Sequence, residues 1–138
     1  METPKLRILI VEDDPAVLAG MAAALDDEMS VDTCGSAEAA LPKINRAEYN
    51  VVCADYGLPI MSGLELLEEL AQRNPPVRGL LVTGSEDSYR VSKRRGYYVL
   101  KKPFDPERLR AVVRHLATLS FMRRSVELLS NGSTPRKK

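Results

Sequence analysis

Residues 51–63 read Val-Val-Cys-Ala-Asp-Tyr-Gly-Leu-Pro-Ile-Met-Ser-Gly, an apolar run that ends at an acid and a loop. The apolar run covers residues 51–54 of a strand predicted over residues 49–54, and such continuous runs are typical of strands buried on both faces of a sheet. After Asp55 come a glycine and a proline, which favour a loop, and Ser62 can cap a helix over residues 63–73. The stretch therefore predicts a buried strand that places Asp55 at its carboxyl end, directly before a loop and a helix.

Short strands and helices alternate on both sides of this stretch. Apolar runs predict four further strands, at residues 6–11, 31–34, 79–83 and 97–101. Amphipathic spacing and capping residues predict helices at residues 16–27, 36–47 and 106–130. Strands that alternate with helices imply right-handed crossovers and a parallel sheet with helices on both faces. We therefore expect one α/β domain with a doubly wound, five-stranded parallel sheet.

The composition is that of one ordinary domain. The 138 residues are 44% apolar and 28% charged, and no apolar run approaches the ~20 residues that cross a membrane. Residues 1–4 have neither the basic nor the apolar region of a signal peptide, so we expect a cytoplasmic protein without a membrane segment. Cys34 and Cys53 lie apart from each other and from His115, which argues against a zinc site and favours a buried thiol at Cys53.

The net charge of +1 conceals a strong division of charge along the chain. Residues 1–69 carry 4 basic and 14 acidic side chains, a net charge of −10, whereas residues 70–138 carry 16 basic and 5 acidic ones, a net charge of +11. Solvated helix faces can produce such a division by chance. The functional alternative is an acidic pocket in the first half and a basic surface on the second. A candidate surface for an acidic partner consists of Arg90, Lys93, Arg94 and Arg95.

Polar side chains follow the predicted strands at the points where the strands end. In an open α/β sheet, ligands bind outside the carboxyl ends of the strands. Three acids, one hydroxyl and one lysine stand at these positions, namely Glu12, Asp13, Asp55, Thr83 and Lys102. We therefore expect these five side chains to converge on one edge of the sheet.

The chemistry of these groups limits what such an edge can do. Three close carboxylates repel one another unless a cation lies between them, and oxygen ligands from few protein groups suit Mg²⁺ or Mn²⁺. A carboxylate can also be a nucleophile and form an aspartyl phosphate, a transfer that depends on positioning and charge neutralisation. The lysine supplies positive charge, the Thr83 hydroxyl can donate to a phosphoryl oxygen, and Gly84 leaves room for the incoming group.

Four motifs in order carry a resemblance to a known family. They are Ile-Leu-Ile-Val-Glu-Asp-Asp at 8–14, the stretch 51–63, Leu-Val-Thr-Gly at 81–84 and Lys-Lys-Pro-Phe at 101–104. Over residues 5–118 the chain resembles the receiver domains of two-component response regulators, of the single-domain type. A lone acidic pair is weak evidence, but four motifs at nearly the family spacing are specific. The resemblance implies a flavodoxin-like strand order, 2-1-3-4-5.

The resemblance also implies roles for individual residues. Asp55 resembles the phosphoacceptor, and Thr83 and Lys102 resemble the pair that binds the phosphoryl group and reports its arrival. The implied ligands of Mg²⁺ or Mn²⁺ are the carboxylates of Asp13 and Asp55, the backbone carbonyl of Gly57 and, through water, Glu12. Such a domain takes its phosphoryl group from a histidine kinase or phosphotransfer protein and signals to a downstream protein. Beyond its own phosphorylation and dephosphorylation it is not an enzyme.

Several side chains have a purely structural interpretation. Asp14 precedes a proline and is typical of a helix cap, so we leave it out of the metal site. Taken alone, Thr83 could be a strand residue whose hydroxyl is satisfied locally. Lys101 is expected in solvent. Surface or packing positions are expected for His115, Tyr49 and Tyr56.

The segment before Lys102 departs from the family pattern. It is shorter than usual, and residues 85–96 place no apolar stripe on a helix, so the fourth helix is expected to be short, irregular or absent. Val99 stands where receivers usually carry an aromatic residue that switches its rotamer, although Tyr98 could replace it. The departure favours a second hypothesis, a constitutive interaction module with the same fold, which the complete acidic pocket opposes. A third hypothesis is a phosphohydrolase or a nucleotide-binding enzyme. The sequence opposes it, because it contains neither of the glycine-rich phosphate-binding motifs typical of such enzymes.

The last helix is predicted to continue beyond the domain. Receivers usually end near residue 118, so residues 1–118 are assigned to the receiver domain and residues 119–130 to an extension of the last helix. Gly132 is expected to stop the helix, and residues 131–138 should form a disordered basic tail. Apolar residues recur every three or four positions along the helix, at Leu109, Val112, Leu116, Leu119, Met122, Val126 and Leu129.

The second half of this apolar stripe should be exposed. Such a stripe suits a homodimer through the last helix or docking to another protein, and the alternative is a helix that folds back on its own domain. Too few residues follow residue 118 for a helix-turn-helix domain. We therefore expect no direct DNA binding and an output that runs through protein contacts.

Overall fold

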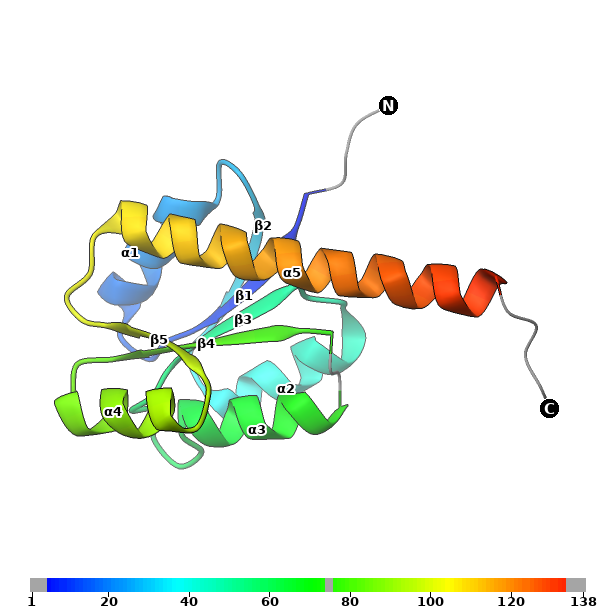
Figure 1. The fold of residues 1–138 in the computed structure, drawn as a ribbon. Coiled ribbons are helices and arrows are strands. Elements are labelled where there is room, and N and C mark those ends of the chain that lie inside the picture. The colour runs from blue at the N-terminus through cyan, green and yellow to red at the C-terminus, as the bar shows by residue number, and fades with distance from the viewer. Residues whose placement is uncertain (1–4, 74–75, 134–138) are drawn as a thin grey trace.

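Five parallel strands form the centre of the structure, a computed structural model that describes residues 5–73 and 76–133 (Figure 1). They are β1 (Arg7–Val11), β2 (Ser30–Cys34), β3 (Val51–Asp55), β4 (Arg78–Thr83) and β5 (Tyr98–Lys101). Across the sheet their order is β2-β1-β3-β4-β5, and all neighbouring pairs are parallel. The predicted doubly wound sheet and its order 2-1-3-4-5 are therefore confirmed.

Helices cover both faces of the sheet. They are α1 (Pro15–Leu25), α2 (Ala37–Arg46), α3 (Gly63–Arg73), α4 (Glu86–Arg94) and α5 (Pro106–Ser133). Figure 1 shows α1 and α5 on one face and α2, α3 and α4 on the other. In the part of the chain that the structure describes, no helix has the length and apolar character needed to span a bilayer.

Alternate residues of the strands enter two cores on opposite sides of the sheet. Leu9 and Val11 of β1 join the core beneath α2 and α3, whereas Ile8 and Ile10 join the core beneath α1 and α5. The thiol of Cys53 lies fully buried in the second core, as the sequence predicted. Burial on both faces is the physical reason that the strand sequences are almost continuously apolar.

Helix α4 confirms the first of the three alternatives expected for the fourth helix, which were short, irregular or absent. It is short, with nine residues, and it is a regular α-helix. The Ser85 hydroxyl caps it by accepting a hydrogen bond from the backbone N–H of Ser88 at 3.2 Å. Arg90 forms ion pairs with Glu86 at 3.5 Å and with Asp87 at 2.8 Å. Capping and local ion pairs thus stabilise a helix that has no apolar stripe.

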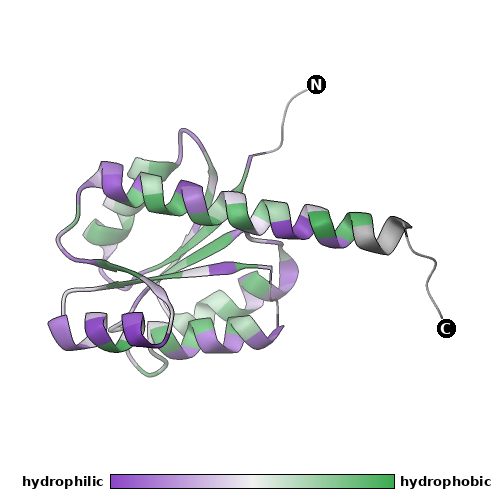
Figure 2. Ribbon diagram, viewed as in Figure 1, coloured by the Kyte–Doolittle hydropathy of each residue, from purple (hydrophilic) through white to green (hydrophobic). Residues whose placement is uncertain are grey.

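Helix α5 extends past the edge of the sheet, as predicted (Figures 1 and 2). Leu109 and Leu116 are buried against the domain and Leu119 is partly buried. The later members of the stripe, Met122 and Leu129 among them, are exposed, so the extension does not fold back on its own domain.

The observed end of α5 differs from the predicted one. The helix continues to Ser133, so the stop predicted at Gly132 is wrong. A glycine within a helix costs only about 1 kcal/mol relative to alanine, which a long established helix tolerates. Residues 134–138, which contain most of the tail predicted to be disordered, lie outside the described residues.

Candidate functional site

The carboxyl ends of two neighbouring strands bring three acids together. Glu12 and Asp13 follow β1, and Asp55 is the last residue of β3. One carboxylate oxygen of each acid lies within 4.8 Å of the others. The structure thus assembles the acidic cluster that the sequence predicted, and its oxygen atoms suit a hard divalent cation.

Glu12 is the buried member of the cluster, with 2% of the residue exposed. Its Oε2 accepts a hydrogen bond from the backbone N–H of Asp14 at 3.1 Å, and its Oε1 accepts one from Lys102 Nζ at 3.1 Å. Burial raises the pKa of Glu12 above its ordinary value, and the negative charge of Asp55 acts in the same direction. Ionisation of Glu12 in the folded protein is therefore less favourable than in water, and a further cation next to the carboxylate would make it more favourable.

Lys102 joins the acids of the two strands. Its Nζ lies 2.9 Å from Asp55 Oδ1 and 3.1 Å from Glu12 Oε1. Partial burial alone would lower the pKa of Lys102, but the hydrogen bonds to Asp55 and Glu12 outweigh it and raise the pKa. Lys102 is therefore protonated, and its ion pairs fix its positive charge within the cluster. Lys101, in contrast, is exposed and pairs with Glu86 at the surface, as expected for the lysine outside the site.

Thr83 ends β4, the strand next to β3, and is buried. Its Oγ1 accepts a hydrogen bond from the backbone N–H of Ser85 at 3.1 Å, so the hydroxyl is bonded locally rather than to the acids. A hydroxyl that accepts one bond can still donate its own proton. The backbone N–H of Lys102 donates to the carbonyl of Thr83 at 2.7 Å, which joins the two residues at the sheet edge.

Two glycines leave space around the cluster. A Cβ atom built on Gly57 would lie 3.5 Å from Asp55 Oδ2, which places Gly57 beside the carboxylate. A Cβ atom on Gly84 would meet only the Cβ of Lys102, at 4.0 Å. The space that the sequence predicted at Gly84 is therefore present.

Gly63 is a residue of the site for which sequence reasoning assigned no role. It is the first residue of α3, and a Cβ atom there would lie 2.2 Å from the backbone oxygen of Asp55. Ser62 and Glu65 form a capping box around this start, with hydrogen bonds of 2.9 and 3.1 Å. The contact requires glycine, because any side chain would push α3 away from the end of β3. The available signal was a glycine directly after a helix cap.

Residues that the sequence left outside the site have structural roles. The Oδ1 atom of Asp14 accepts two backbone hydrogen bonds from the first turn of α1, at 2.9 and 3.3 Å, which confirms the cap. The Tyr49 hydroxyl donates to Asp32 at 2.6 Å, and burial together with this bond raises the pKa of Tyr49 to about 12. His115 is exposed and contacts Tyr98 edge-on.

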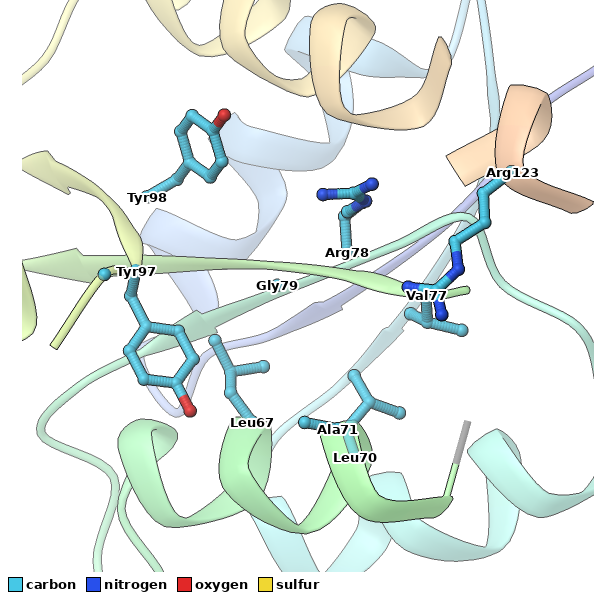
Figure 3. Close-up of a pocket in the computed structure, with 10 residues that line it drawn as sticks. Leu67, Leu70, Ala71, Val77, Arg78, Gly79, Tyr97, Tyr98 and Arg123 are labelled. Atoms are coloured by element: carbon cyan, nitrogen blue, oxygen red, sulfur yellow. The ribbon is translucent and has the colours of Figure 1, made fainter. Parts of the chain in front are cut away.

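A separate pocket lies at the opposite, amino-terminal end of β4. Figure 3 shows Leu67 and Leu70 on one side of it, with Arg78 and Arg123 nearby. Its volume is about 210 Å³, and no residue of the acidic cluster lines it. The acids, Thr83 and Lys102 thus form a distinct site at the other end of the sheet.

Comparison with known proteins places this geometry in a family. The sequence matches the family model of the response regulator receiver domain over residues 8–114. The nitrogen assimilation regulatory protein NtrX of Azorhizobium caulinodans is 31% identical over 134 residues, which cover 93% of this chain and 30% of that protein. The probable transcriptional regulatory protein TcrX of Mycobacterium tuberculosis is 34% identical over 115 residues, covering 78% of this chain and 49% of TcrX. The chain thus spans less than half the length of these curated relatives.

Solved structures agree with the sequence comparison. A CheY-like receiver domain protein from Methanospirillum hungatei has a TM-score of 0.77 and 29% identity, covering 86% of this chain and 98% of that one. NtrX from Brucella abortus has a TM-score of 0.79 and 27% identity, covering 91% of this chain and 30% of that one. Given the family match and the shared fold, this chain belongs to the response regulator receiver domains, the phosphorylation-dependent signalling switches of two-component systems.

Proposed function

We propose that Asp55 accepts the phosphoryl group, from a histidine kinase or a phosphotransfer protein, and that the chain then signals by contact with a downstream protein. The observation that carries this proposal is the ion pair of 2.9 Å between Lys102 Nζ and Asp55 Oδ1. The Asp55 side chain is 12% exposed, so a donor can reach it, whereas Glu12 is buried more deeply. Asp55 is also the acid at the end of the central strand β3.

The proposed step is an in-line displacement. A carboxylate oxygen of Asp55 attacks the phosphorus of the donor's phosphohistidine, so that a P–O bond forms while the P–N bond breaks. The imidazole leaves with the electron pair of that bond and takes up a proton. Lys102 orients the carboxylate and neutralises developing charge, and Thr83 donates its hydroxyl proton to a phosphoryl oxygen. The open space at Gly84 receives the group.

The residues present fit Mg²⁺ or Mn²⁺. Asp13, Asp55 and the backbone carbonyl of Gly57 would hold the ion, and Glu12 would reach it through water. This ligand set is supported by three carboxylates within 4.8 Å, whose negative charge Lys102 neutralises only in part. When bound, the ion supplies positive charge next to the carboxylates and the phosphoryl oxygens.

We assign this chemistry to a receiver domain of residues 1–118, with residues 119–130 as an extension. Output is proposed to run through Thr83 to α4, because Ser85 joins the two. The Ser85 backbone N–H bonds to the Thr83 hydroxyl, and the Ser85 hydroxyl caps α4. A Thr83 hydroxyl that turns towards a phosphoryl group would therefore disturb the cap. This route does not require an aromatic residue at position 99, where this chain has valine.

Phosphorylation by a small phosphodonor tests the proposal. The full chain is incubated with the donor and Mg²⁺, and the modified residue is mapped by mass spectrometry. We expect one acyl phosphate, on Asp55. Modification at another residue would contradict the assignment. A chain that takes up no phosphoryl group, from this donor or from histidine kinases, would favour a phosphate-independent interaction module.

Mg²⁺ is expected to stabilise the fold, because it binds the native acidic cluster and relieves its repulsion. At a concentration ten times the dissociation constant, the gain is about 1.4 kcal/mol, or several degrees in Tm. Asp13→Asn removes one ligand but leaves the pair between Lys102 and Asp55 in place, so its Mg²⁺-dependent shift should be much smaller. The control is Asp27→Asn, the same change at an exposed position outside the cluster. Thermal unfolding at matched ionic strength checks this, and equal shifts in all three proteins would contradict it.

A further inference from the structure

Helix α5 changes its apolar side after Ser120. Up to this residue the side that faces the domain is apolar and buried, and it includes Leu109, Val113 and Leu116. At 3.6 residues per turn, the same side continues with Arg123, Arg124 and Glu127. Arg124 donates to the backbone oxygen of Tyr49 at 3.0 Å, and Arg123 pairs with Glu127 at 3.2 Å. The domain-facing side of the extension is therefore polar.

From Phe121 onward, the large apolar residues of the extension lie on its other sides and are exposed. Their exposed fractions are 49% for Phe121, 55% for Met122, 61% for Val126, 73% for Leu128 and 72% for Leu129. In the described part of the chain these are five of the seven large apolar residues that are exposed. A concentration of this kind on one helix indicates an interaction surface. The domain does not cover it, because beyond Ser120 the domain bonds to the polar side of the extension, at Arg124.

We propose that a second copy of the chain covers this surface, with the two extensions antiparallel about a two-fold axis at Ser125. The sequence of the extension has the required symmetry. Phe121 and Leu129 lie four residues on either side of Ser125, and Met122 and Leu128 lie three residues on either side. In the antiparallel pair, Phe121 of one copy therefore faces Leu129 of the other. The small side chain of Ser125 allows close approach at the crossing point.

The position of the domains favours the antiparallel arrangement over a parallel one. The outer side of α5 before the extension carries the exposed side chains of Arg114 and His115, and Arg114 pairs with Glu28 at 2.9 Å. A parallel pair would bring both domains, with these bulky polar side chains, to the same end of the paired helices. An antiparallel pair keeps the two domains at opposite ends.

The size of the surface suits a dimer of moderate affinity. Each of the five side chains can bury about 100 Å², so two copies would bury about 1,000 Å², near the lower limit of specific interfaces. The extension is already helical because the domain holds its first half, so pairing has little ordering cost. A groove beside Phe121 and Leu128, lined also by Leu6 and Ala47, leaves room next to this surface.

Sedimentation equilibrium of the full chain, without phosphodonor, tests the proposal. The wild type should be a concentration-dependent dimer. The double variant Leu128→Glu with Leu129→Glu should weaken dimerisation by about 100-fold or more, since it places charges in a symmetric apolar contact. Its thermal stability should match that of the wild type at concentrations where both are monomeric, because both residues are exposed in the single chain. Ile60→Glu, which alters an aliphatic residue that is 95% exposed elsewhere on the surface, is the matched control and should dimerise normally.

Disulfide formation tests the direction of the helices. The native Cys34 and Cys53 are buried, so cysteines introduced in the extension can be followed alone. Phe121→Cys and Leu129→Cys variants should cross-link when mixed and form few disulfides separately. Efficient cross-linking within each separate variant would overturn the antiparallel arrangement. If the wild-type chain is monomeric at all concentrations, the dimer proposal is wrong, and the exposed surface would then bind a different protein.

Discussion

Replacement of Asp55 by asparagine is expected to abolish phosphorylation. The carboxamide keeps the shape of the side chain but loses the ionised oxygen that would attack phosphorus and form the acyl phosphate. Lys102 and Thr83 cannot compensate, because they stabilise charge but supply no nucleophile in this site. Labelling by a small phosphodonor in Mg²⁺ should fall to background, by at least about 100-fold, since the loss of a nucleophile costs enzymes far more than that. The incorporated phosphoryl group is quantified against the wild type.

Two controls separate lost chemistry from lost structure. Asp27→Asn makes the same change at an exposed acid outside the cluster and should label as the wild type does. Asp55→Asn removes one of three mutually repelling carboxylates, so its Tm without Mg²⁺ should be unchanged or higher. Undiminished labelling of Asp55→Asn would show that another residue accepts the group, and the assignment of Asp55 would then be wrong.

Replacement of Gly63 by alanine is expected to be strongly destabilising. Its added Cβ would lie 2.2 Å from the backbone oxygen and 2.8 Å from the backbone carbon of Asp55. Backbone atoms at the end of a central strand cannot move aside as a flexible side chain can, so α3 must shift. We expect a loss of about 2–4 kcal/mol and a fall in Tm of about 10 °C. Phosphorylation should slow as well, because the same contact positions Asp55.

The matched control is the same substitution where space is open. Gly20 lies in α1, is exposed, and has no heavy atom within 4 Å of an added Cβ. Gly20→Ala should stabilise the protein by up to about 1 kcal/mol, because alanine favours helix more than glycine does. The two substitutions therefore have opposite expected signs in denaturant unfolding. Similar small effects at both positions would show that the close approach at Gly63 is relieved at little cost.

Local patterns were enough to predict the secondary structure and the members of the acidic cluster. A strand buried on both faces must be apolar at nearly every residue, so β1 and β3 are visible as runs. Parallel strands share one carboxyl edge, so acids that directly follow β1 and β3 were expected on the same edge of the sheet. The cap at Asp14 was also predictable, because its partners lie within three residues. The short fourth helix was likewise predictable from its missing apolar stripe, and its regular geometry follows from the Ser85 cap and the ion pairs of Arg90.

Other features depend on contacts between residues that are far apart in the chain. The strand order came from family resemblance, because apolar runs do not reveal which strands are neighbours. Lys102 and Glu12 are 90 residues apart, and only the packed sheet shows that they bond and how deeply Glu12 is buried. The clash that excludes a side chain at Gly63 exists only once α3 rests on the end of β3. Likewise, the exposed apolar surface of α5 is defined by which side of the helix meets the sheet, and helical spacing alone does not determine this.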